Sequence, residues 1–219
     1  MIDEIRLVLV TTAEGRLDQK LYNQPINSLP AKCALCGFPD INAIPQPYYI
    51  ARSRASTSSS ISLAEMGNFL VKPAAKGIIE GISQSICTFY PTYYRNTEEV
   101  SNWSLAVPSA LVDTGHIKDN IPRCPECGEP RSGHYGTQYE YNSSHSIAVD
   151  IAKSRNWMSG DRGWDVDLSR QHLISIRLYQ LLKKLKLKGI FEVGGDTPLT
   201  TNENRWVKSM IAAFRNEEQ

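Results

Sequence analysis

The amino-acid sequence predicts an α+β fold, with one mostly antiparallel sheet and helices packed against it. Continuous apolar or aromatic runs at 5–10 and 85–94 are typical of strands. Leucines at helical spacing over 178–185 instead indicate a helix with one apolar face. The chain has 219 residues, of which 41% are hydrophobic, so it is long enough to bury a core as a single domain over 1–219.

Two segments of the first half predict a helix and a strand. Residues 60–70, SISLAEMGNFL, predict a helix because Ser62 and Glu65 have the spacing of a capping box. Residues 85–94, SICTFYPTYY, predict a strand that Pro91 interrupts, since proline cannot donate a hydrogen bond to a neighbouring strand.

The C-terminal part carries the clearest helical pattern. Ser175 is a good N-cap for a helix that Gly189 ends with a left-handed stop, and IFEV at 190–193 continues as a strand. The apolar stripe of this helix consists of Leu178, Leu181, Leu182 and Leu185. A second amphipathic helix is predicted over 202–219, docked on the body of the protein. Its apolar side consists of Trp206, Met210, Ile211 and Phe214.

The charge balance does not favour a particular partner. The formal net charge is +1, so no global field attracts nucleic acid or an anionic membrane. Four lysines nevertheless crowd the end of the leucine helix. They are interpreted as a solvated face that complements the helix dipole, with nucleic-acid binding as the alternative. These residues are Lys183, Lys184, Lys186 and Lys188.

Four of the five cysteines lie in two copies of one phrase, Cys-x-x-Cys-Gly-x-Pro, at 33–39 and 124–130. Each copy places two thiols on one tight turn, and its glycine suits a left-handed position that turns amide hydrogens toward the sulfurs. Four thiolates satisfy tetrahedral zinc and leave no position open for a substrate. The sequence therefore predicts a structural zinc site, in which a four-cysteine pair of zinc knuckles ties two distant segments together. The predicted ligands are Cys33, Cys36, Cys124 and Cys127.

Other interpretations of these cysteines remain open. Iron in a rubredoxin-like centre would use the same ligands. Disulfides, a thioredoxin-like redox pair and a site that has lost its metal are further alternatives. Residues 37–123 would form a large elaboration between the two knuckles. Cys87 lies outside both motifs and is expected to be a buried free thiol.

No targeting segment, membrane span or catalytic motif is evident. Two acidic residues precede the short apolar run near the start, whereas a signal peptide has a basic front. No apolar run is long enough to span a membrane, so a cytoplasmic location is expected. None of the four histidines has the spacing of a metal or catalytic motif, and no nucleophile elbow or phosphate-binding loop is present. The expectation is that the protein is not an enzyme.

The order of the motifs resembles the double-CxxCG motif family of bacterial proteins. The matching pieces are CALCG at 33–37, CPECG at 124–128, and WDVDL at 164–168 running through LKLKGIFEV at 185–193. The resemblance covers roughly residues 30–193, and the chain departs from it after residue 198 and in the serine-rich segment 52–60. Members are associated with contact-dependent toxin systems of bacterial competition, where they look like immunity proteins.

The resemblance implies an antitoxin that binds one cognate toxin domain in a one-to-one complex and blocks it by occlusion. It assigns no catalytic residue, only the four cysteines. The alternatives are a zinc-ribbon protein that binds nucleic acid or regulates, and an enzyme that reverses the toxin's modification. Aromatic residues are candidates for the partner interface, although core packing is the competing role for each. These candidates are Tyr90, Tyr93, Tyr94 and Trp103.

Overall fold

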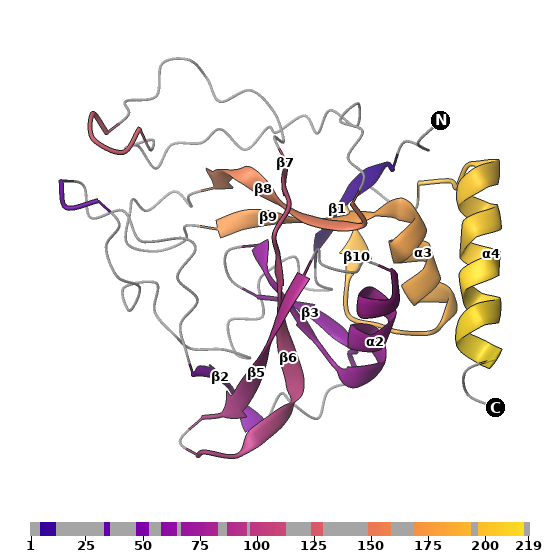
Figure 1. Ribbon diagram of the computed structural model, residues 1–219, viewed down its shortest axis with the longest axis horizontal. Coiled ribbons are helices and arrows are strands. Elements are labelled where there is room, and N and C mark those ends of the chain that lie inside the picture. Colours follow the sequence, from indigo (N-terminus) through magenta and orange to yellow (C-terminus); the bar gives the residue numbers. More distant parts are fainter. Residues whose placement is uncertain are drawn as a thin grey trace.

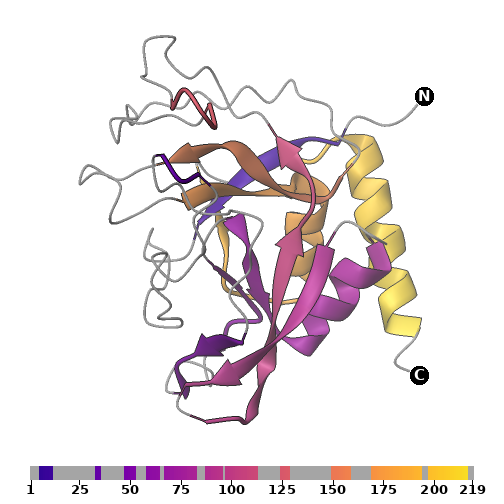
Figure 2. The same ribbon diagram turned by 60° about the vertical axis from the view of Figure 1, so that its left-hand side comes forward.

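The computed structural model confirms the α+β class. The strands among its described residues form two five-stranded sheets, where the sequence predicted one. The three helices within the described residues lie together on one side of the sheets (Figures 1 and 2). The described residues are 5–11, 33–35, 47–52, 58–64, 67–82, 87–95, 97–112, 124–128, 149–158, 169–193 and 197–216.

The first sheet has the order β10-β1-β9-β8-β7. Its central strand β9 (Ser169–Ser175) pairs antiparallel with β1 (Leu7–Thr11) and with β8 (Ile151–Met158). The short strand β10 (Phe191–Glu192) pairs antiparallel with β1, and β7 (Leu111–Val112) pairs parallel with β8. The strands predicted near residues 5–10 and 190–193 are therefore confirmed.

The second sheet has the order β2-β5-β6-β4-β3. The hairpin of β5 (Cys87–Tyr94) and β6 (Val100–Pro108) forms its centre, and β4 (Phe69–Val71) and β3 (Ile61–Leu63) continue it in antiparallel pairing. On the other edge, β2 (Tyr48–Ile50) pairs parallel with β5. Antiparallel pairs thus predominate in both sheets.

The helix predicted over residues 60–70 is wrong, because this segment contributes strands β3 and β4. Ser62 does not cap a helix but lies within β3, where its register partner is Leu70 of β4. Gly67, with φ +74°, adopts the left-handed backbone between the two strands. All the side chains of β3 and β4 are buried, so burial on both faces outweighs the local capping pattern.

Pro91 interrupts the pairing of its strand, as predicted, but the strand continues beyond it. Strand β5 continues to Tyr94, and its register against β6 shifts between Pro91 and Tyr93. Such a bulge accommodates a residue that lacks an amide hydrogen. The strand can therefore carry its aromatic residues beyond the proline to the end of the β5–β6 hairpin.

Helix α2 (Pro73–Ile82) forms although the segment contains two glycines, Gly77 and Gly81. Pro73 occupies the first helical position, where the missing amide hydrogen costs nothing. The buried residues Ala75, Ile78 and Ile79 recur at helical spacing on one face. Gly81 lies beside the ring of Phe214 from the C-terminal helix, and a Cβ at Gly81 would be in ordinary van der Waals contact with that ring, at 3.5 Å.

Helix α3 (Ile176–Lys184) begins as predicted but ends differently. The Ser175 hydroxyl accepts a hydrogen bond from Leu178 N at 3.1 Å, which confirms the N-cap. The left-handed residue after the helix is Lys186, with φ 60°, and not Gly189. Gly189 has φ +132° and is needed for close approach, since a Cβ there would lie 1.8 Å from the carbonyl oxygen of Ile61.

Helix α4 (Thr201–Asn216) confirms the predicted C-terminal helix and its docking in cis. It begins with a capping box that the sequence analysis missed. Thr200 N donates to Glu203 Oε2 at 2.7 Å, and Glu203 N donates to Thr200 Oγ1 at 3.3 Å. Glu203 also accepts from the guanidinium of Arg6, which ties the helix start to the residue before β1. The four apolar residues predicted for one side of α4 pack against the main core.

One hydrophobic cluster contains buried residues from both sheets and from each of the described helices, so the two sheets share a core. None of the helices in the described ranges is long and apolar enough to cross a membrane. Representative members of the core cluster are Val8, Ile174, Phe69, Ala106, Ile79, Leu181 and Val207.

Candidate metal centre

The second cysteine motif forms the tight turn that its glycine predicted. Gly128 has φ +72°, a left-handed conformation that favours glycine, and a Cβ there would meet nothing within 4 Å. Its amide donates a hydrogen bond to Cys124 O at 2.8 Å, which closes the turn around Cys127. Both thiols of this motif are therefore held on one short loop.

The two motifs come together in space. The Sγ atom of Cys33 lies 3.8 Å from the Sγ of Cys124, although the two residues are 91 positions apart. The sulfurs of Cys33, Cys124 and Cys127 all lie within 4.8 Å of one another. The predicted joining of two distant segments is thus seen for three of the four cysteines. Cys36, the fourth predicted ligand, lies outside the described residues.

The distance between the sulfurs of Cys33 and Cys124 fits two ligands of one metal ion. Thiolates about 2.3 Å from a tetrahedral ion lie about 3.8 Å from one another, which matches the separation of 3.8 Å between Cys33 and Cys124. A disulfide would bring two sulfurs to about 2.05 Å, and none of Cys33, Cys124 and Cys127 forms a disulfide. The soft sulfur donors suit zinc, iron or copper(I), so the donor set restricts the metal without identifying it.

The cluster is sheltered from solvent. Cys33 and Cys124 are each only 2% exposed, whereas Cys127 is half-buried. The carboxylate of Glu126 accepts a hydrogen bond from Cys33 Sγ at 3.6 Å. The turns at 33–35 and 124–128 lie at the end of the molecule away from α4 (Figure 1). A metal ion held there would join two turns that are 91 positions apart in the sequence.

Cys87 lies outside this cluster. It is a free, half-buried thiol that packs against the main core, in keeping with the prediction of a free thiol. Burial raises the pKa of Cys87 to about 12, against the opposing effect of the Lys153 charge. Since the thiolate is the reactive form, Cys87 is not activated as a nucleophile at neutral pH.

A buried polar group joins the two sheets. His172 on β9 is 5% exposed, and its Nε2 donates a hydrogen bond to Ala64 O at 2.7 Å. Lys153 on β8 is the register partner of His172, and its Nζ donates to Asn68 Oδ1 at 3.2 Å. His116, His134 and His145 lie outside the described residues. His172 therefore acts as a structural residue of the sheet interface.

The four aromatic interface candidates divide into two groups. Trp103 is 1% exposed and belongs to a second core cluster, against which Tyr90 and Tyr94 also pack. Tyr93 faces the other way. It is half-buried, and its ring centroid lies 6.4 Å from that of Tyr49 on the neighbouring strand β2.

Tyr93 belongs to a row of partly exposed side chains across three strands. Its register partners are Tyr49 on β2 and Val100 on β6, and Val100 is 57% exposed. Register partners on neighbouring strands share one face of the sheet. Tyr49, Tyr93 and Val100 therefore form one strip, here called the tyrosine strip. Tyr49 and Val100 were not among the predicted interface residues, because only the strand register brings them beside Tyr93.

No protein-family model matches the chain, and a search of curated proteins finds no match. The resemblance to the double-CxxCG motif family therefore rests on the order of the motifs alone.

Proposed function

We propose that this protein is an immunity protein that binds a cognate antibacterial toxin domain and blocks it without turnover. The observation that carries the proposal is the meeting of the two CxxCG motifs in one cysteine cluster. The order of these motifs is the feature shared with the double-CxxCG family. A cluster of this kind maintains the fold rather than performing chemistry, so the function is assigned to a surface of the protein.

The proposed metal is one zinc ion per chain, with Cys36 as the fourth ligand. Four thiolates complete the coordination of zinc and leave no position for a substrate. The ion would close a loop of 91 residues between Cys33 and Cys124. Closing so long a loop costs roughly several kcal/mol of chain entropy. The binding of the metal offsets this cost.

Metal content tests this part of the proposal. Protein purified without chelator is expected to contain about one zinc per chain by elemental analysis. Cys124→Ser should lose the zinc and lower the melting temperature sharply, because three thiolates cannot complete the site. Cys87→Ser is the matched control, since Cys87 lies outside the cluster. A wild-type protein without metal, or equal effects of the two substitutions, would contradict the assignment.

The proposed contact surface is the tyrosine strip. Its aromatic side chains offer large contact area at low entropic cost, and aromatic residues are typical anchors of protein interfaces. Tyr90 and Tyr94 pack mainly against the second core cluster, and Arg52 covers the Tyr94 ring at 4.6 Å from its centroid. Trp103 is buried. These three residues would support the strip from behind rather than contact the toxin.

Two valines provide a matched test of the contact surface. Val100 lies in the strip and is 57% exposed, whereas Val193 follows β10 and is 49% exposed. Val100→Asp should abolish the complex with the cognate toxin domain, because it places a charge in an apolar contact. Val193→Asp should leave the complex intact. Growth of cells that express both proteins and the stoichiometry of the co-purified complex provide the readouts.

Three outcomes would overturn this function. The first is protection against unrelated toxins as well as against the cognate one. The second is equal effects of the two valine substitutions. The third is full protection at amounts far below the toxin, which would indicate an enzyme that reverses the damage.

A further inference from the structure

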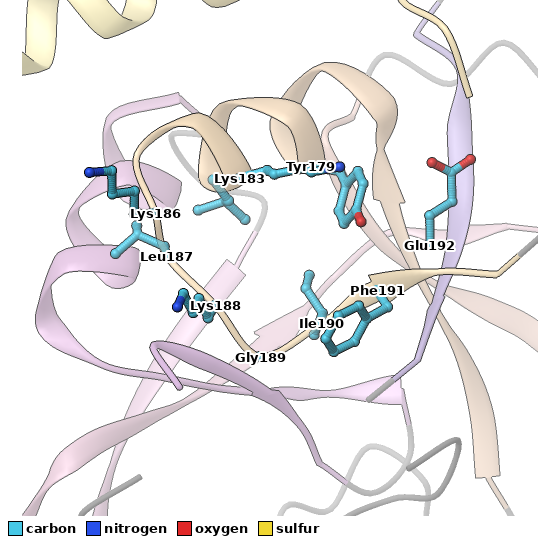
Figure 3. A pocket seen from close by; sticks show the side chains of 10 residues that line it. Tyr179, Lys183, Lys186, Leu187, Lys188, Gly189, Ile190, Phe191 and Glu192 are labelled. Atoms are coloured by element: carbon cyan, nitrogen blue, oxygen red, sulfur yellow. The ribbon is translucent and has the colours of Figure 1, made fainter. Parts of the chain in front are cut away.

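A cavity of about 590 Å³ opens between the end of α3 and the segment that leads into β10. Figure 3 shows Tyr179 above this space and Ile190 and Phe191 below it. Leu182 and Leu187 complete an apolar lining. Tyr179 is 7% exposed and Phe191 is 48% exposed, so one ring belongs to the core and the other stands at the opening.

The backbone that walls this cavity is fixed by hydrogen bonds. Leu187 N donates to Leu182 O at 2.9 Å, which holds the chain against the helix end. Lys188 O then accepts from Ser60 N at 2.7 Å and from Ile61 N at 3.2 Å. Because the wall is anchored to β3 in this way, little conformational freedom remains to be lost when a ligand enters.

The charges around the cavity favour an anion. Lys183, Lys186 and Lys188 line it and are exposed, and Figure 3 shows Lys183 extending beside Tyr179. The only acidic residue in its described lining is Glu192. The Glu192 carboxylate accepts hydrogen bonds from the backbone N–H of Thr197 at 3.0 Å and from the Thr197 hydroxyl, so it is directed to that turn.

We propose that this cavity binds a small molecule with an aromatic body and one anionic group. The aromatic body would lie between Tyr179 and Phe191, and the anion would face the lysines. Cavities of about 300–1,000 Å³ with apolar walls and a few charged groups are typical of small-molecule sites. The lysines that the sequence predicted as a solvated face at the end of the helix would thus bind the anionic group of this ligand.

Calorimetry with three matched probes tests the charge preference of the full-length protein. The probes are naphthalene carboxylate, naphthalene methanol and naphthalene methylamine, which share a ring system and differ in charge. The carboxylate should bind at least about fivefold more tightly than the alcohol, and the amine more weakly than both. Equal affinity of the carboxylate and the alcohol, or no binding of the carboxylate, would overturn the proposal.

Two double variants with the same change of net charge locate the site. Lys183→Gln with Lys188→Gln should reduce carboxylate affinity about fivefold or more and leave alcohol binding unchanged. Lys184→Gln with Lys208→Gln changes lysines that do not line the cavity, so its affinities should match those of the wild type. Equal losses in both variants would contradict the site.

The exposed ring of Phe191 allows a test of the apolar part of the proposed site. Phe191→Ala should weaken both the carboxylate and the alcohol, because one side of the aromatic site is lost. Amide chemical shifts should move around residues 182–192 when the carboxylate is added. Shifts confined to other parts of the chain would place the ligand elsewhere and overturn the assignment.

Discussion

Acidification below pH 6.5 should destabilise this protein through His172. Burial is the main cause that lowers the pKa of His172, from the ordinary value of 6.5 to about 4. Hydrogen bonds to the backbone of Ala64 and Asn68 oppose this effect, and the charge of Lys153 adds to it. The ring also packs edge-on against Phe69, with centroids 5.2 Å apart. The folded protein therefore holds this side chain in its neutral form.

The size of this loss of stability follows from the linkage between protonation and folding. Below pH 6.5 the unfolded chain binds a proton at His172 that the folded protein does not bind until about pH 4. Stability is thus lost as the pH falls through this window, and His172 causes no further loss below it. The whole window corresponds to about 3 kcal/mol of unfolding free energy, and the step from about pH 7 to about pH 5 to about 2 kcal/mol.

Urea unfolding of the wild type and of His172→Gln, followed by tryptophan fluorescence, measures how much the protonation of His172 lowers the unfolding free energy. Glutamine can still donate to Ala64 O but does not titrate. The stability difference between the two proteins should therefore shrink by about 2 kcal/mol between about pH 7 and about pH 5. Protonation of the cysteine cluster affects both proteins and cancels in the difference. A difference that stays constant over this range would refute the reasoning.

Four further substitutions test the packing and the helix caps. Gly189→Ala should destabilise the fold by about 2–5 kcal/mol in denaturant unfolding, because its Cβ would overlap the Ile61 carbonyl. Gly77→Ala, where a Cβ meets nothing within 4 Å, should instead stabilise α2 by about 0.5–1 kcal/mol. Ser175→Ala should lower the unfolding free energy by about 1–2 kcal/mol through loss of the α3 cap, and an unchanged value would contradict the cap. Burial alone would raise the pKa of Glu203, but hydrogen bonds from Arg6 and Thr200 hold it below the ordinary 4.5. Glu203→Gln should therefore cost about 1 kcal/mol at neutral pH, and this cost should disappear as acid protonates the wild-type carboxylate below 4.5.

The elements that the sequence predicted correctly depend on nearby residues. The cap at Ser175 and the leucine stripe of α3 lie within a few turns of one another, so the local pattern is sufficient. The left-handed glycine of the second cysteine motif is equally local. The meeting of Cys33 with Cys124 is not local, but a repeated motif of metal ligands predicts such a contact because one ion needs both copies.

The predictions that failed concern residues whose environment comes from elsewhere in the chain. Ser62 has the sequence context of a helix cap, yet Leu70 on the adjacent strand decides its conformation. Gly189 is required by the carbonyl oxygen of Ile61 and not by the end of its own helix. In both cases the deciding neighbour is set by strand pairing, which the local pattern does not contain.

The candidate surfaces show the same division. Which residues are aromatic, cationic or able to hold a metal follows directly from the amino-acid sequence. That Trp103 is core while Tyr93 shares an exposed strip with Tyr49 and Val100 follows only from the fold. The fold likewise places Lys183 and Lys188, which were predicted as part of a solvated helix end, at the border of a cavity. The physical reason is that residue chemistry is fixed by the side chain alone, whereas exposure and neighbourhood depend on the register and packing of distant segments.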